Sequence, residues 1–363
     1  MKAYNTDLPK RFQTARKYFK IPAESHQIHN VIYDHGFGYS FPSKPITTQI
    51  PAGTYQVGYT RDHDFILSKT SKVNRIDSNE SIEDLLMELN GFIDEKEVDK
   101  NQFKNVAHEK SYGFMGRGYF PLHEYNSSLN SVYEELILFL NNKEFYQKSE
   151  LGFKRSVLLY GDTGVGKSRF LDWFSKSMIK ELDAIVIRLN NSDDIDRLNS
   201  HGLNTLNRVA KNRLIIFLIE ELSSLVGYRQ SHLGLLNLLD NPILRDNVLF
   251  LSTTNNPEKI PANIIARQQR LDVLAEVNPK DNSDDFVDAF YEFVFQEEFP
   301  PKYKTSEWYE KPLTPAALKE LFIYAQMHQV DLDASYQKIK ERERLVKDNF
   351  DSRDPVGFSL FDE

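Results

Sequence analysis

The chain has 363 residues, of which 40% are hydrophobic and 27% are charged, and its formal net charge is −8. This composition is typical of a globular protein with room for two or three domains. The absence of cysteine excludes disulfides, thiolate metal sites and cysteine nucleophiles. The acidic balance argues against a broadly basic surface for nucleic acid, although it leaves room for a local basic patch.

The sequence gives no sign of a membrane span or of a secretory signal. Its densest apolar run, Leu214–Ile219, has only six residues, whereas a bilayer crossing needs roughly 20. The N-terminus is basic and has no apolar core of the kind that signal peptides carry. We therefore expect a cytoplasmic protein without a membrane span, and an organelle presequence is the alternative.

Residues 1–125 are predicted to form a mixed α+β region. Glycine-bearing turns and strand-forming residues predict a β-hairpin over Asn30–Phe41 and strands over Thr54–Thr60 and Asp64–Lys69. The spacing of apolar residues over Asn79–Asn90 predicts a short amphipathic helix. No motif in this region indicates a particular chemistry.

Residues 126–279 are predicted to form an α/β domain. A helix capped by Ser128 or Asn130 is expected to run through Leu140, because apolar residues recur there at helical spacing. Short apolar strands then alternate with helices, which predicts a parallel sheet covered on both faces. The expected strands are Ser156–Tyr160, Ala184–Leu189, Leu214–Ile219 and Val248–Thr253, and the expected helices are Lys167–Leu182, Gly234–Leu239 and Ala262–Gln269.

Residues 280–363 are predicted to be helical and strongly charged. The expected helices are Asp285–Gln296, Pro315–His328 and Asp333–Lys347.

A glycine-rich loop between an expected strand and an expected helix carries the strongest functional signal. Residues 161–168 read GDTGVGKS and fit the pattern G-x-x-x-x-G-K-[ST]. Backbone N–H groups of such a loop and of the following helix N-terminus bind phosphate oxygens. Lys167 can reach the β- and γ-phosphates, and the Ser168 hydroxyl can coordinate Mg²⁺. The predicted nucleotide-binding residues are Gly161, Asp162, Thr163, Gly164, Val165, Gly166, Lys167, Ser168 and Arg169.

Two carboxylates follow another apolar strand about fifty residues later. Residues 214–222 read LIIFLIEEL, so Glu220 and Glu221 come at the strand end, on the ligand edge of a parallel sheet. In P-loop hydrolases the first acid supports Mg²⁺ and the second activates the attacking water. We assign these roles to Glu220 and Glu221, and note that Glu220 is one methylene longer than the usual Asp.

Residues 254–272 read TNNPEKIPANIIARQQRLD, which resembles the AAA+ ATPase branch with the motif T-N-R-P-x-x-[IL]-x-x-A-[IL]-x-R-x-x-R-x-D. Leu235–Asp240 and Glu276–Pro279 fit the same branch. Within it, Gly152–Gly161 and the preceding helix resemble the Rieske-protein translocase subfamily and its bacterial and phage relatives.

The resemblance implies a P-loop NTPase αβα sandwich with a C-terminal helical lid, acting as a Mg²⁺- and ATP-dependent homo-oligomeric ring, expected to be a hexamer. It gives Asn255 the role of orienting the attacking water. It makes Arg267 or Arg270 the arginine finger that reaches the nucleotide of a neighbouring subunit. By the same resemblance, residues 1–125 select the substrate.

The sequence departs from the family pattern at two places. Asp162 and Thr163 replace the usual Pro-Pro or Pro-Ala of the loop, which places a carboxylate near the phosphates. Asn190–Asn204 lacks the aromatic residue with which threading unfoldases grip a polypeptide, so we do not expect the protein to thread unfolded chains. The leading expectation is a folded protein client that is remodelled or translocated. The alternatives are a DNA-associated ATPase, such as a loader or a transposition or phage replication factor, and a nucleotide-gated assembly switch in defence or signalling.

Overall fold

A computed structural model describes most of the chain from residue 119 onward. The described residues are 119–199, 212–226, 229–265 and 270–350, together with the strands 31–34, 53–59 and 65–68 and the single positions 11, 12, 14, 15, 203, 206 and 210. The predicted helix over Asn79–Asn90 lies outside this set.

Eight strands form one sheet in the order β1-β3-β2-β5-β6-β7-β4-β8. The five strands from β5 to β8 pair only in parallel with one another, which confirms the predicted α/β fold. Their bounds are β4 Lys154–Tyr160, β5 Ile185–Leu189, β6 Ile215–Ile219, β7 Val248–Thr254 and β8 Val273–Glu276. The edge strand β8 was not predicted, because its alternating pattern VLAE is too short to stand out from the motif before it.

Three N-terminal strands extend this sheet beyond β5. They are β1 Val31–Asp34, β2 Gly53–Tyr59 and β3 Phe65–Ser68. Strand β2 pairs in parallel with β5, while β3 pairs antiparallel with both β2 and β1. The predicted hairpin over Asn30–Phe41 thus supplies one strand whose described partner is β3, and residues 35–41 lie outside the described set.

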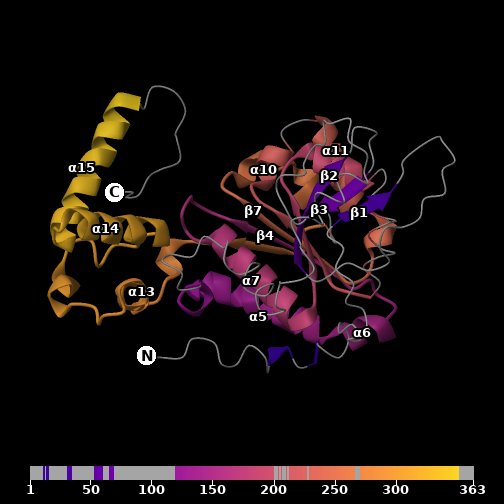
Figure 1. Cartoon of the computed structure of the whole chain (residues 1–363), viewed down its shortest axis with the longest axis horizontal. Helices are drawn as coiled ribbons and strands as arrows, with labels where there is room; N and C mark the ends of the chain where they lie inside the picture. Colours follow the sequence, from indigo (N-terminus) through magenta and orange to yellow (C-terminus); the bar gives the residue numbers. More distant parts are fainter. Residues whose placement is uncertain are drawn as a thin grey trace, which may run out of the picture.

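Helices cover both faces of the five-stranded core (Figure 1). Alternate residues of each strand enter two separate apolar clusters, as the two-residue period of a strand requires. Val157, Val186 and Leu249 face α5 and α7, whereas Leu158, Ile185 and Phe250 face α8 and α11. The bounds are α5 Ser127–Asn141, α6 Lys143–Lys148, α7 Lys167–Leu182, α8 Ser192–Arg197, α10 Leu222–Leu225, α11 Arg229–Leu239 and α12 Ala262–Ile265.

The N-cap of α5 is Asn126, which corrects the prediction of Ser128 or Asn130. Its Oδ1 accepts a hydrogen bond from the N–H of Leu129, 3.1 Å away, and so satisfies one of the free donors of the first turn. Its Nδ2 donates to the carbonyl of Asn278 and to Oδ1 of Asn282. One buried amide therefore fixes the start of α5 to the chain that leads from the sheet into the lid.

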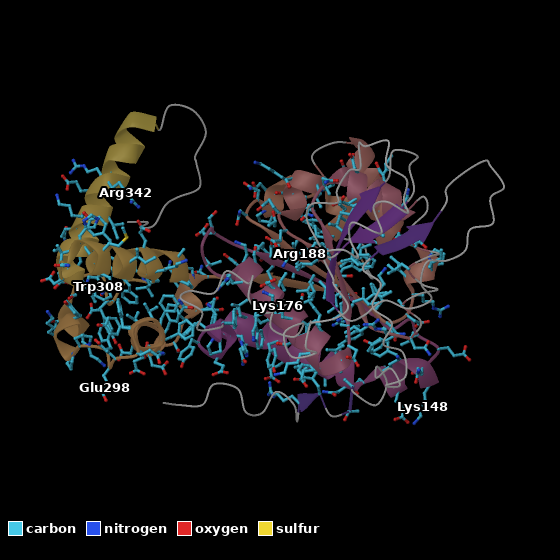
Figure 2. All side chains as sticks on the ribbon, in the orientation of Figure 1. Lys148, Lys176, Arg188, Glu298, Trp308 and Arg342 are labelled. Atoms are coloured by element: carbon cyan, nitrogen blue, oxygen red, sulfur yellow. The ribbon has the colours of Figure 1, made fainter. Side chains whose placement is uncertain are left out.

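The lid consists of α13 Phe286–Phe295, α14 Pro315–His328 and α15 Leu332–Phe350, which lie to one side of the sheet domain in Figure 1. Fully buried Trp308, labelled in Figure 2, donates to Asp333 at 2.8 Å. This bond joins α15 to the segment that precedes α14. Short 3₁₀ helices lie in the connections of the sheet domain and of the lid: η3 Leu122–Glu124, η5 Pro242–Leu244, η6 Pro257–Lys259, η7 Pro279–Asp281 and η8 Pro301–Thr305.

Residues 119–126 form an aromatic arm between the sheet domain and the lid. Phe120 packs against Phe286 and Phe290 of α13, with ring centroids 6.0 and 5.0 Å apart. On the other side, His123 lies between Tyr133 of α5 and Trp173 of α7, at 4.5 and 4.4 Å. The arm thus joins the core below the sheet to the core of the lid.

None of the described helices combines the length and the apolar composition that a bilayer crossing requires.

We expect His123 to make the protein less stable in mild acid. The ring is 4% exposed, and burial, with a smaller effect of Arg11, lowers its pKa to about 4. Between pH 6.5, roughly the pKa of an unfolded histidine, and pH 4, the unfolded chain binds a proton that the folded chain does not, so acidification favours unfolding.

From pH 7 to pH 5 the wild-type free energy of unfolding should therefore fall by about 1–2 kcal/mol more than that of His123→Phe. Urea denaturation at the two pH values measures this difference. His328→Gln, which changes an exposed ring, should behave like the wild type, and equal losses in the wild type and His123→Phe would contradict the assignment.

Candidate active site

The glycine-rich loop connects β4 to α7 in the conformation that phosphate binding requires. Gly164 and Gly166 have φ values of +86° and +101°, a region that residues with a Cβ rarely adopt. A Cβ at Gly166 would also lie 2.2 Å from Leu122 of the aromatic arm, and one at Gly164 would lie 2.8 Å from Ala316 of the lid. The loop is therefore a cradle that lies against both the arm and the lid. Asp162, Thr163 and Arg169 are exposed at its rim.

Lys167 begins α7 and points back into the loop. Its Nζ donates to the carbonyls of Gly161 and Asp162, at 2.7 and 2.6 Å, and to Oδ1 of Asn255 at 2.8 Å. These three acceptors use all three donors of the ammonium group. Burial lowers the pKa of Lys167 to about 8, although the carboxylates of Glu221 and Asp162 act in the opposite direction. A phosphate would restore the charged form.

Asn255 connects Lys167 to Glu221. It follows the end of β7, and its amide accepts from Lys167 while its Nδ2 donates to Oε2 of Glu221 at 2.8 Å. Because the carboxyl ends of parallel strands meet at one edge of the sheet, residues 167, 221 and 255 come together although they are far apart in the sequence. Three residues assigned from separate motifs thus form one continuous hydrogen-bonded chain.

The Glu221 carboxylate is held by several donors. Oε1 accepts from the Ser223 hydroxyl at 2.5 Å and from the Thr254 hydroxyl at 2.9 Å, and the N–H of Asn255 lies 3.2 Å from both oxygens. The backbone of Glu221 is left-handed, with φ +54°, which is rare for a residue with a side chain and typical of functional positions. Sequence reasoning missed Ser223 and Thr254, since only the folded strand ends bring them to the carboxylate.

The donors expected at a Mg²⁺ site are a hydroxyl, Ser168, and a carboxylate, Glu220. Ser168 lies in the first turn of α7, and Glu220 follows β6, two residues after Leu218, whose side chain faces α7. Hydroxyl and carboxylate oxygens are hard ligands of the kind that Mg²⁺ accepts beside the phosphates of a nucleotide. Glu220 is engaged otherwise here: its Oε1 accepts from Arg188 of β5 at 2.6 Å.

No described group of three or more His, Cys, Asp or Glu side chains could hold a metal ion by itself. The donors thus fit a metal shared with a nucleotide, in which phosphate oxygens complete the coordination. When bound there, Mg²⁺ would neutralise the developing charge on the phosphates.

Arg270 lies in a buried ion pair. Its side chain is 7% exposed, and its Nε and Nη2 donate to the two carboxylate oxygens of Asp240, at 3.0 and 2.5 Å, directly after α11. Its Nη1 donates to the carbonyl of Asn263, on α12. Asp240 and Arg270, which come from two separate motifs of the sequence, thus bind each other, and each nitrogen of the guanidinium has an acceptor within the chain. Arg267, the other candidate finger, lies outside the described residues.

The start of α14 closes the loop from the lid side. The N–H of Ala316 donates to the carbonyl of Gly164 at 3.3 Å, and Thr314 caps α14 through the N–H of Ala317. The first turn of this helix therefore faces the phosphate cradle, so the lid and the loop are in direct contact.

Binding of ATP should be linked to proton uptake by Lys167 above pH 8. At pH 8.5 about three quarters of a group with a pKa of 8 is neutral, and the phosphates favour its charged form. Calorimetric titration of ATP in two buffers of different ionisation enthalpy should show uptake of about 0.7 proton per nucleotide at pH 8.5 and about 0.1 at pH 7. The same uptake at both values, or none at pH 8.5, would contradict the buried position of this lysine.

Comparisons with known proteins agree with this geometry. Residues 157–279 match the model of the ATPase family associated with various cellular activities (AAA). Similar proteins include the probable mitochondrial chaperone bcs1 of Schizosaccharomyces pombe, 32% identical over 149 residues that make up 38% of this chain and 31% of the relative.

A probable mitochondrial chaperone BCS1-A of Dictyostelium discoideum is 26% identical over 41% of this chain and 37% of its own length. A cell division cycle protein 48 homolog of Archaeoglobus fulgidus is 27% identical over 42% of this chain and 22% of its own length. The chain thus spans between 22% and 37% of the length of these relatives. The family match, the sheet order and the phosphate cradle together show that this chain carries an AAA ATPase domain with the P-loop NTPase fold.

Proposed function

We propose that this protein is a Mg²⁺- and ATP-dependent ATPase that works as a homo-oligomeric ring, a hexamer, and remodels or translocates a protein client. The observation that carries the proposal is the chain of hydrogen bonds from Lys167 through Asn255 to Glu221. It links a phosphate-binding cation to a carboxylate that could accept a proton from water. A cytoplasmic location stays a prediction from the sequence.

Each residue of the chain has a defined part in this reaction. Lys167 and the loop N–H groups bind the phosphates and offset their charge. Glu221 orients and deprotonates the attacking water, and Asn255 holds the carboxylate and the water in line with the γ-phosphate. The Ser223 and Thr254 hydroxyls both donate to Oε1 of Glu221, whereas Oε2 accepts from the side chain of Asn255 and shares its N–H with Oε1, so Oε2 is the oxygen with room to accept a proton from water.

The names of the relatives support a protein client. Two of them are described as mitochondrial chaperones and one as a cell division cycle protein. The acidic net charge of −8 is in keeping with a client other than nucleic acid.

The proposal makes Glu221→Gln a variant that binds ATP without hydrolysing it. Turnover should fall by about 10²-fold or more, because general base catalysis is lost, whereas ATP affinity should change by less than about threefold. Phosphate release and titration with a fluorescent ATP analogue measure the two quantities. Glu258→Gln, which removes the same charge from an exposed residue of η6, is the matched control and should retain wild-type turnover. Unchanged turnover in Glu221→Gln would contradict the assignment.

The same variant tests the ring and the client. With ATP its mass in solution should be that of a hexamer, and a tagged copy isolated from its native host should retain a discrete protein after nuclease treatment. Nucleic acid that nuclease removes, together with replication or recombination proteins, would indicate a DNA-associated ATPase. A ring with nothing bound and slow, unstimulated turnover would indicate a nucleotide-gated switch.

Substitution of Arg267 and of Arg270 should have different effects on turnover and on stability. Arg267→Ala should lower turnover by about 10³-fold or more and leave the melting temperature unchanged, as expected for a finger that acts on the neighbouring nucleotide. Arg270→Ala should lower the free energy of unfolding by about 1–3 kcal/mol, since it leaves Asp240 without its bidentate partner. Phosphate release and thermal melting of both variants distinguish the roles. A fully stable but inactive Arg270→Ala would instead make Arg270 the finger.

A further inference from the structure

Arg188 is a charged residue near the nucleotide site that has no part in the proposed reaction. It lies on β5, where its register partner on β6 is Leu218. Val186, two residues before it, and Leu218 both face α7, so by the two-residue period of a strand Arg188 and Glu220 point to the α7 face as well. Figure 2 shows Arg188 and Lys176 close together over the middle of the sheet domain.

The guanidinium of Arg188 bridges two carboxylates. Its Nη1 donates to Oε1 of Glu220 at 2.6 Å, and its Nη2 donates to Oδ1 of Asp172 at 2.5 Å. Asp172 is four residues after Ser168 on α7, and residues at this spacing lie on the same helix face, one turn apart. Arg188 is therefore held between Glu220, which was assigned to the metal, and Asp172, which lies one helix turn after Ser168.

We propose that Arg188 is a positioning residue that holds Glu220 away from the metal position, and that it thereby sets the Mg²⁺ concentration that nucleotide binding requires. This inference rests on the proposed Mg²⁺- and ATP-dependent function. Oε1 of Glu220 is directed to Arg188, and the positive guanidinium beside it repels a divalent cation, so the ion pair opposes metal binding at this carboxylate.

A neighbouring cation, Lys176, shows that the effect should be specific to Arg188. Lys176 also donates to Asp172, at 2.6 Å, and this ion pair does not include Glu220. Arg188→Gln and Lys176→Gln thus remove the same charge from the same cluster, and only the first releases Glu220. The extra methylene of Glu220, compared with the Asp usual in the family, is what allows its carboxylate to swing between the two partners.

The experiment measures binding rather than turnover. The full chain, freed of metal with EDTA, is titrated with Mg²⁺ in the presence of a fluorescent ATP analogue, and the Mg²⁺ midpoint of analogue binding is recorded. For a partly exposed ion pair we expect Arg188→Gln to lower this midpoint by about three- to fivefold, and Lys176→Gln to change it by less than about twofold. Affinity for the analogue in EDTA should be the same in all three proteins.

Two further variants separate a positioning role from a structural one. Arg188→Lys keeps a cation beside Glu220, so its midpoint should return toward that of the wild type. In a Glu220→Gln background, Arg188→Gln should have no further effect on the midpoint, because Arg188 acts through Glu220.

Equal shifts in Arg188→Gln and Lys176→Gln, or an unchanged midpoint in Arg188→Gln, would overturn the inference and leave the proposed function intact. A wild-type chain whose analogue binding does not depend on Mg²⁺ would overturn the proposed function and the inference with it. If Arg188→Gln fails to fold, Arg188→Met, which keeps the aliphatic stem and removes the charge, takes its place: a Mg²⁺ midpoint within about twofold of the wild type would overturn the inference.

Discussion

The charge of Lys167 is the constraint round which this site is arranged. Lys167 is 6% exposed, so its ammonium group needs acceptors for all its donors, and it finds them in two loop carbonyls and in Asn255. Satisfying the lysine orients the amide of Asn255, and the amide in turn fixes Glu221. A nucleotide that binds in the loop therefore has to replace protein acceptors of Lys167 with its own phosphates. The pKa of Lys167 is lowered for the same reason, because burial disfavours the charged form of its side chain.

The rest of the fold supports this arrangement from three sides. The parallel sheet brings the ends of β4, β6 and β7 to one edge. Leu122 of the aromatic arm lies against the loop at Gly166, and Ala316 in the first turn of α14 lies against Gly164. The arm also packs on α13 through Phe120, and Asn126 binds the chain that leads into the lid, so the same short segment contacts both the phosphate cradle and the C-terminal helices. Arg188 adds a fourth contact, between the sheet and α7, on the side of Glu220.

Sequence patterns predicted the elements that carry strong periodicity or fixed motifs. Helix α14 begins and ends as expected, α7 begins at Lys167, and the four apolar strands lie within two residues of their predicted bounds. Strand β8 was missed because four alternating residues give too weak a signal, and the cap of α5 was misplaced because the four Asn and Ser residues in 126–130 all fit the same rule. Side-chain partnerships were beyond the sequence. That Arg270 binds Asp240 and that Arg188 binds Glu220 depends on strand register and helix packing, which no local pattern specifies. The addition of β2 to the edge at β5 is a long-range pairing of the same kind.

The most direct test of the central claim is an experimental structure of the chain with Mg²⁺ and a non-hydrolysable ATP analogue. The account predicts that Nζ of Lys167 leaves the carbonyls of Gly161 and Asp162 for the β- and γ-phosphates, while Asn255 and Glu221 stay at the γ-phosphate end of the nucleotide. A nucleotide bound elsewhere, or one bound in the loop while Lys167 keeps its three protein acceptors, would contradict it.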